Sequence, residues 1–179
     1  FQNIMRKSLL SLLVLFVYSL VAFAQEGTEI TWSGHSVWSG VVEKAAQISY
    51  AQGDWSIQAS KGDGSTNPTV NETSNDCRVY AKGVVMISNE AGIGKLVFHI
   101  SAAGKKRWTT ITPSEGVITE DFEHSTITWE ANGADVKLLM LGVGEKATLG
   151  TEGTSKAGQF DFSSVTAYTA AELAVTEPD

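Results

Sequence analysis

Apolar and polar residues alternate along much of this chain, most clearly in segment 76–101. Apolar side chains recur there at every second position, at Cys77, Val79, Val85, Ile87, Leu96, Phe98 and Ile100. This is the period of a half-buried β-strand and not of a helix. Asparagine and glycine in residues 89–94 favour a turn, because both tolerate positive φ. The pattern predicts two strands joined by a turn, with a sheet at the centre of the fold.

Further segments are short, rich in β-branched or aromatic residues, and separated by turns that contain glycine. They are 29–32, 47–51, 54–59, 107–112, 125–130, 134–141 and 159–168. Asn132-Gly133 stands between two of them and predicts a hairpin. Only residues 40–47 favour a helix, of barely two turns. We therefore expect an all-β fold, an antiparallel β-sandwich or jelly roll of about 8 to 10 strands.

The first 24 residues have the features of a cleavable signal peptide. Arg6 and Lys7 precede an apolar run, and Ala22-Phe23-Ala24 fits the small-x-small sequence before a cleavage site. We expect residues 25–179 to form a single β-sandwich domain with a frayed tail at 169–179. The protein would be secreted, periplasmic or at the cell surface, with no membrane span after cleavage. The alternative is an uncleaved membrane anchor, because the run approaches the roughly 20 residues that span a bilayer.

The expected mature chain is acidic, which disfavours two classes of partner. Loss of Arg6 and Lys7 with the leader changes the formal net charge from −7 to −9. A chain without basic clusters is a poor candidate for binding nucleic acid or anionic membranes. Cys77 is the only cysteine, so no disulfide forms within the chain. Its place in the alternating pattern predicts a buried, unreactive thiol.

Several short motifs occur in an order that is similar to a class of secreted domains. They are GDWSIQASKGDGSTNPTV, CRVYAKGVVMIS, GIGKLVFHIS, STITWEANGADVKLLM and GQFDFSSVTAY. Together they resemble the β-sandwich modules of secreted Bacteroidetes proteins. Lys82-Gly83 departs from that pattern, in which Gly-Asn or Lys-Asn is expected, and so does Phe160-Asp161-Phe162, where isoleucine is commoner. The resemblance implies a galactose-binding-like jelly roll, a type in which carbohydrate-binding modules are frequent, but it implies no particular ligand.

Candidate ligand-binding residues come from the aromatic side chains and from one strand. Exposed indoles stack on sugar rings, and Trp38 and Trp108 have the polar neighbours that favour exposure. Burial in the core is the alternative for both. Arg78 and Tyr80 lie on the strand face opposite Cys77, where a planar guanidinium beside a ring suits sugar hydroxyls or a carboxylate. The alternative for this pair is a cross-strand ion pair.

Calcium is the one cofactor for which the sequence offers candidate ligands. Jelly-roll modules bind a structural calcium between the first and last strands, so the resemblance makes Glu29 and Asp161 the candidate ligands. Catalysis finds no support, because the three histidines are scattered and neither a Gly-x-Ser-x-Gly nor an HExxH motif occurs. We expect no enzyme and no other cofactor.

Two functions of different classes remain. In the first, the protein binds a polysaccharide or other glycan through exposed aromatics and the Arg78–Tyr80 strand face. In the second, it is a structural or adhesive cell-surface protein that engages a protein partner. The exposure of the tryptophans distinguishes the two: clustered, exposed indoles favour the glycan, whereas uniformly buried indoles favour the structural function.

Overall fold

The computed structural model describes residues 26–174, which form an antiparallel β-structure with short helices. The strands are β1 (Thr28–Ile30), β2 (Gln47–Gln52), β3 (Trp55–Ser60), β4 (Thr69–Val70), β5 (Cys77–Tyr80), β6 (Val84–Ile100), β7 (Thr109–Pro113), β8 (Val117–Asp121), β9 (Thr126–Glu130), β10 (Val136–Ala147) and β11 (Gln159–Thr169). The helices are the 3-10 turn η1 (His35–Val37), α2 (Ala102–Lys106) and α3 (Ala170–Ala174). The all-β prediction is confirmed, and the predicted signal peptide, 1–24, lies outside the described residues.

β6 is the strand around which the sheet is built, and it is longer than predicted. Its 17 residues run without interruption through the turn expected at 89–94. Asn89 Oδ1 accepts a hydrogen bond from the Ala91 N–H at 2.9 Å, and Gly92 has a φ of 88°. The prediction of a turn is therefore wrong, because these residues bend a strand without reversing it. A turn comes earlier, between β5 and β6, where the Gly83 N–H donates to the Tyr80 carbonyl at 2.8 Å.

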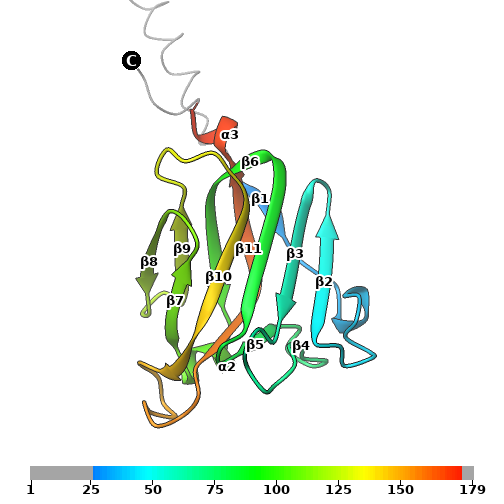
Figure 1. Ribbon diagram of the computed structural model, residues 1–179, viewed down its shortest axis with the longest axis vertical. Helices are drawn as coiled ribbons and strands as arrows, with labels where there is room; N and C mark the ends of the chain where they lie inside the picture. The colour runs from blue at the N-terminus through cyan, green and yellow to red at the C-terminus, as the bar shows by residue number, and fades with distance from the viewer. Residues whose placement is uncertain (1–25, 175–179) are drawn as a thin grey trace, which may run out of the picture.

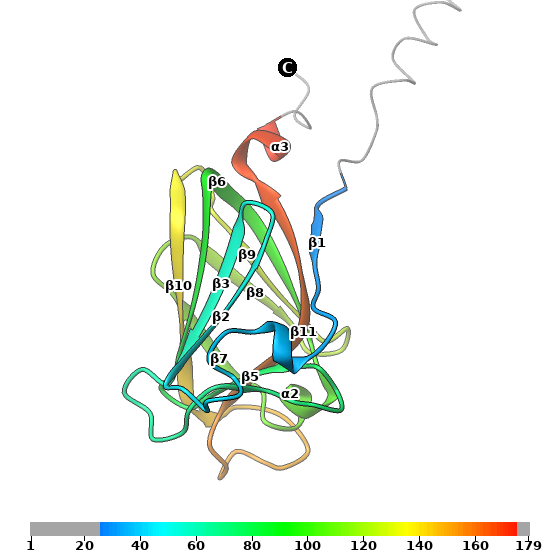
Figure 2. The same cartoon turned by 90° about the vertical axis from the view of Figure 1, so that its right-hand side faces the viewer.

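The bend in β6 divides the sheet into two parts that share this strand. The first part has the order β2-β3-β6-β10-β7 and uses residues 84–88 of β6. The second part has the order β8-β9-β6-β11-β5-β4 and uses residues 95–100 of β6, with β1 also paired to β11. Figure 1 shows β10, β6, β3 and β2 side by side, and the turned view in Figure 2 separates β10, β3 and β2 from β11 and β1.

One continuous hydrophobic core is formed by the buried positions of both parts. In the first part these are Ile57, Ile87 and Leu139, which lie opposite one another across three strands. In the second part, Phe98 lies 5.0 Å from Phe160 between ring centroids. Cys77 is also fully buried, and burial raises the pKa of its thiol well above the ordinary value. The predicted burial of Cys77 is confirmed.

Asn132-Gly133 forms a tight turn but not the predicted hairpin. Asn132 and Gly133 both have positive φ, 51° and 87°, and the Ala134 N–H donates to the Ala131 carbonyl at 3.1 Å. The flanking strands β9 and β10 do not pair with each other; each pairs with β6. The hairpin prediction is therefore wrong, because this turn carries the chain from the second part of the sheet to the first.

Two predictions about helices and the tail also need correction. Residues 40–44 form turns and not the predicted helix. Part of the predicted frayed tail, 169–179, is regular: Thr169 ends β11, and α3 follows. The Thr169 N–H donates to Glu172 Oε2 at 2.6 Å, and the Glu172 N–H donates to Thr169 Oγ1 at 3.3 Å, which is a capping box at the start of α3. Within residues 26–174, no helix combines the length and hydropathy needed to cross a bilayer.

Candidate functional site

All five tryptophans are core residues, including the two expected to be exposed. None has more than 7% of its surface exposed, and Trp38 and Trp108 are at 2% and 1%. The Trp38 ring stacks on Tyr50 at 5.4 Å between centroids. The Trp108 ring packs edge-on against Phe122 at 5.2 Å, and its Nε1–H donates to Glu120 Oε2 at 2.8 Å. The expectation that Trp38 and Trp108 present open stacking faces is therefore wrong.

The physical reason is that polar neighbours in sequence do not determine where an indole points. Ser39 pairs with Ser49 through two backbone hydrogen bonds of 2.8 and 3.0 Å. This pairing holds the adjacent Trp38 over the edge of the core, where it meets Trp32 at 5.0 Å between centroids. The polar residues beside Trp38 stay outside while the indole is buried.

Arg78 is held by a buried carboxylate. As predicted, Cys77 and Val79 are buried and Arg78 and Tyr80 lie on the other face, partly exposed. Arg78 Nε donates to Asp76 Oδ2 at 3.0 Å, and Asp76 is fully buried. The partner is two residues away in the chain, so the alternative of a cross-strand ion pair is wrong in its geometry. With Asp76 as its partner, the Arg78 fork is already largely occupied.

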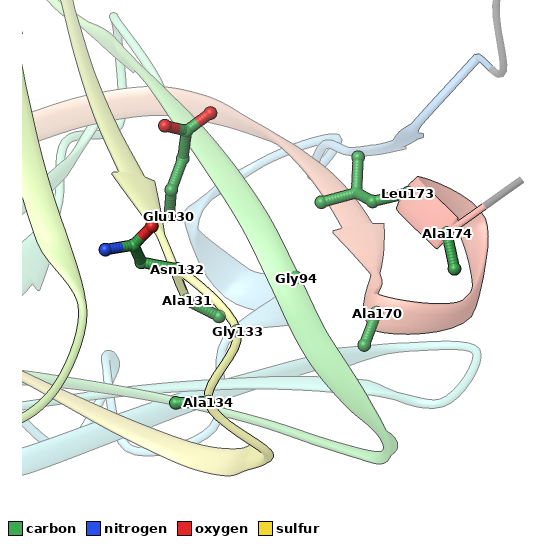
Figure 3. Close-up of a pocket in the computed structure, with 9 residues that line it drawn as sticks. All are labelled: Gly94, Glu130, Ala131, Asn132, Gly133, Ala134, Ala170, Leu173 and Ala174. Atoms are coloured by element: carbon green, nitrogen blue, oxygen red, sulfur yellow. The ribbon is translucent and has the colours of Figure 1, made fainter. Parts of the chain in front are cut away.

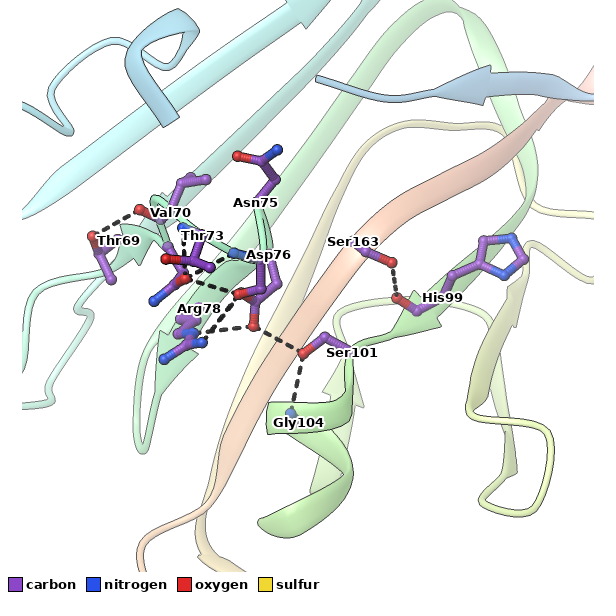
Figure 4. Close-up of polar contacts among 12 residues, drawn as sticks. Thr69, Val70, Thr73, Asn75, Asp76, Arg78, His99, Ser101, Gly104 and Ser163 are labelled. Carbon is purple, nitrogen blue, oxygen red and sulfur yellow. Dashed lines mark hydrogen bonds and ion pairs between the residues drawn. The ribbon is translucent and has the colours of Figure 1, made fainter. Parts of the chain in front are cut away.

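Asp76 also joins β5 to the start of α2. Figure 4 shows the Ser101 hydroxyl donating to Asp76 Oδ2, at 2.9 Å, while Ser101 Oγ accepts from the Gly104 N–H at 3.2 Å. The Ser74 hydroxyl donates to Asp76 Oδ1. Burial by itself would raise the pKa of Asp76, but hydrogen bonds from Arg78, Ser74 and Ser101 outweigh it and hold that pKa below its ordinary value. Asp76 is therefore an ionised structural centre.

Asp161 is the second buried carboxyl, and it behaves in the opposite way. It lies opposite Arg78 in the pairing of β11 with β5, and it is fully buried. Its Oδ1 atom has no hydrogen-bond partner. Burial, and then the charge of Asp76, raise the pKa of Asp161 to about 8. Asp161 is therefore mainly protonated at pH 7. α2 lies directly over it, since a Cβ atom on Gly104 would come within 3.2 Å of Asp161 Cβ.

The predicted calcium ligands do not come together. β1 does pair with β11, but Glu29 lies opposite Thr166, five positions along β11 from Asp161. At about 3.4 Å per residue, the two carboxyls are about 17 Å apart along the strand. One ion cannot bridge that distance, so this pair is wrong as a single site. Across residues 26–174, no group of three or more His, Cys, Asp or Glu side chains has a geometry suited to a metal ion.

A hollow of about 430 Å³ lies at the corner where β6 bends. Figure 3 shows that it lies between the Asn132-Gly133 turn and α3, with Gly94 of β6 between them. Its lining consists mainly of glycine and alanine, and its one charged side chain, Glu130, is paired with Lys95 at 3.2 Å. The hollow offers shape without a set of convergent polar groups.

On the outer face of the first part of the sheet, outward side chains that lie opposite one another on neighbouring strands form three rows. None of these rows contains a charged side chain. We call this surface the uncharged face. The register of the strands defines its rows as Gln47-Ser60-Val84-Gly142-Thr112, Ser49-Gln58-Met86-Met140 and Ala51-Ser56-Ser88-Leu138. Leu138 and Met140 are 55% and 47% exposed, which is high for large apolar residues. Met86 lies directly opposite Met140 on the neighbouring strand.

The outer face of the second part, which we call the charged face, has rows of the same kind. They are Glu29-Thr166-Val97-Thr128-Thr119, Ser164-His99-Thr126-Asp121 and Tyr168-Lys95-Glu130-Val117. The Thr166 hydroxyl donates to Glu29 Oε2 at 2.7 Å, and His99 Nε2 is 2.9 Å from Thr166 Oγ1. This face therefore has the mixed polar and charged character of an ordinary solvated surface.

Sequence reasoning missed both the uncharged face and the pair of buried carboxyls. The outward positions of the three rows hold no lysine, arginine, aspartate or glutamate, although β6 and β10 carry charged residues outside these rows, at Glu90, Lys137 and Glu145 among others. The sequence alone does not show which strand positions form these rows. Asp161 stands between Phe160 and Phe162, so strand alternation predicts that it points outward; its burial depends on α2, which covers that face. Its position opposite Arg78 was not foreseeable either, because it depends on the pairing of β11 with β5.

Comparison with known proteins adds no relative. No family model matches the chain, and neither a curated protein nor a solved structure is significantly similar to it. The resemblance to Bacteroidetes modules stays a prediction, and function has to be argued from the surfaces described above.

Proposed function

We propose that this chain is an exported, non-catalytic structural or adhesive protein that contacts a partner protein through its uncharged face. The single observation that carries the proposal is the absence of charge from the three rows of that face. Burying a charge without a partner costs several kcal/mol, so a surface that another protein covers tends to lack isolated charges. A solvated face has no such restriction, and the charged face of the same sheet holds lysine, glutamate and aspartate.

The distribution of side chains on the uncharged face agrees with this function. Its centre, on β6 and β10, is apolar: Val84, Met86, Leu138 and Met140. Serine and glutamine on β2 and β3 and threonine on β7 flank that centre on both sides. Protein interfaces have this arrangement, an apolar centre within a polar rim, and methionine adapts its shape to a partner.

Burial of the indoles favours this function over glycan binding. Sugar recognition was expected to use stacking on Trp38 or Trp108 together with Arg78, but both rings are in the core and Arg78 is paired with Asp76. Export is supported by the signal-like sequence in residues 1–24. We also infer that the two parts of the sheet are the layers of a jelly-roll type β-sandwich. The shared core and the passage of β6 from one part to the other support this.

Site-specific photo-crosslinking tests the proposal. The full chain, with a photoreactive amino acid at position 140 of the uncharged face, is expressed in the cell that produces it. The matched control has the same amino acid at position 128, which is partly exposed on the charged face. We expect protein adducts from position 140 and few from position 128. Absence of a protein adduct at position 140, or equal adducts at both positions, would contradict the proposal.

A further inference from the structure

We propose that the partner of the uncharged face is the same face of a second copy of this chain, in a two-fold symmetric dimer. This inference rests on the proposed function and names its partner. It is argued from the charge of the protein, from the chemistry of the face, and from its area.

Charge favours a contact at this face over one elsewhere on the surface. The whole sequence has a formal net charge of −7, so two copies repel each other at most orientations. The repulsion is smallest when the approaching surfaces carry no charge, which holds for the three rows of the uncharged face and not for the charged face. A partner of opposite charge would instead be matched by acidic side chains on the binding surface. The rows of this face provide none.

The side chains of the face are complementary to themselves. A two-fold dimer brings the same patch of both copies together, so each group meets another group of the same patch, and a group near the two-fold axis meets its own copy. Serine, threonine and glutamine each donate and accept hydrogen bonds, so Gln58 or Thr112 of one copy can pair with the same residue types of the other. The apolar centre, Met86 and Met140, packs on itself around any two-fold axis that passes near it. Lysine or glutamate near that axis would repel its own copy.

The area of the face predicts a weak dimer. The three rows hold thirteen outward positions, on strands about 4.8 Å apart and about 7 Å apart along each strand, which gives roughly 440 Å² on each copy. A dimer then buries about 900 Å² in total, which is in the range of weak, transient interfaces. We therefore expect a concentration-dependent equilibrium, with monomer at low micromolar and dimer at high micromolar concentration.

Sedimentation velocity over this concentration range tests the dimer. We expect the unmodified protein to change from monomer to dimer, and Met140→Lys to weaken association at least about tenfold, because two like charges meet in the interface. Val97→Lys is the matched control, since Val97 is also an outward position of β6 but lies on the charged face. It should associate as the unmodified protein does. Thermal melting of both variants checks that each is folded.

A charge-reversal experiment separates a specific contact from a general effect of charge. Met140→Lys and Met140→Glu should each be monomeric alone, whereas an equal mixture of the two should recover dimer. A protein that stays monomeric throughout, or one whose dimer tolerates Met140→Lys, would overturn the inference. The crosslinking experiment distinguishes this failure from that of the proposed function. An adduct at position 140 with twice the mass of the chain supports the dimer, whereas an adduct with a different protein retains the proposed function and rejects the second copy.

Discussion

The two outer faces of this sheet have the same geometry and different chemistry. Each presents three lateral rows of outward side chains set by strand register, and β6 contributes to both. On the charged face, Lys95 pairs with Glu130 and Thr166 bridges His99 and Glu29. On the uncharged face, the corresponding positions hold methionine, leucine, serine and glutamine. In our proposal, this difference reflects what each face meets, water on one side and protein on the other.

The buried groups divide between the two parts in a similar way. Both buried carboxyls, Asp76 and Asp161, belong to the second part, around the pairing of β5 with β11. The buried polar residues of the first part, Asn89 and Thr109, do not titrate. The pH dependence of the fold should therefore originate in the second part, whereas association should depend on the first.

The largest expected effect comes from the core that both parts share. Trp38→Ala should lower the free energy of unfolding by about 3 to 5 kcal/mol, because it leaves a cavity beside Trp32 and Tyr50. Leu138→Ala, on the uncharged face, should change it by less than about 1 kcal/mol. Urea denaturation measures both. A Trp38→Ala protein of unchanged stability would mean that this indole is not a core residue.

Asp161 gives the next largest effect. Its pKa is about 8 in the folded protein against an ordinary value of 3.8, so between these values the folded state holds a proton that unfolding releases. The free energy of unfolding should therefore fall as the pH rises from 5 to 8, by up to about 1.4 kcal/mol per pH unit. Asp161→Asn should remove most of this slope, because it keeps a neutral side chain of the same shape.

Denaturation midpoints at several pH values measure this slope. Asp76 cannot mimic the effect, since its pKa is lowered and its contribution to stability is lost only as the pH falls through the acidic range. A slope that persists in Asp161→Asn would show that another group carries the proton.

Substitution of Gly92 tests the bend in β6 that separates the two parts of the sheet. Its φ of 88° is unfavourable for other residues, although the nearest atom to an added Cβ would be 3.5 Å away. Gly92→Ala should therefore destabilise the fold by about 1 to 2 kcal/mol through the backbone alone. Gly142→Ala is the matched control on β10, where no positive φ is required and the nearest atom is 3.7 Å away. Thermal melting should show a lower midpoint for the first variant only.

The smallest effect is expected on the charged face. Replacing Lys95 and Glu130 together with serine removes an exposed ion pair and should change the free energy of unfolding by at most about 1 kcal/mol. The dimer should also be unaffected, as judged by sedimentation. Loss of association in this double variant would mean that the dimer forms through the charged face and not through the uncharged face.

The sequence predicted the strands well because side-chain alternation is a local property. β2, β3, β9 and β11 occur within a few residues of the expected segments. The course of the chain at turns was harder to predict, because a positive φ determines only the local backbone. The residues around Asn89 and Gly92 bend a strand. The Asn132-Gly133 turn carries the chain from β9, which pairs with the second half of β6, to β10, which pairs mainly with the first half. Whether the chain reverses there depends on which strands pair, and that is decided over long distances.

The candidate site was the least predictable feature for the same reason. Arg78 and Tyr80 were placed on the correct strand face, but the partner of Arg78 proved to be Asp76. The burial of Trp38 depends on the bridge between Ser39 and Ser49, and that of Trp108 on contact with Phe122. The uncharged rows exist only when β2, β3, β6, β10 and β7 lie side by side, because β6 and β10 also carry charged residues outside them.

The methyl groups of Met86 and Met140 provide the most direct measurement. They are the only methionines in residues 26–174, and they lie opposite each other at the centre of the uncharged face. Methyl NMR of the labelled protein, with a soluble paramagnetic probe, reports their exposure as the protein concentration rises. We predict that both signals shift and become protected from the probe at high concentration. Two methyl signals that stay equally accessible at every concentration would contradict the dimer at this face.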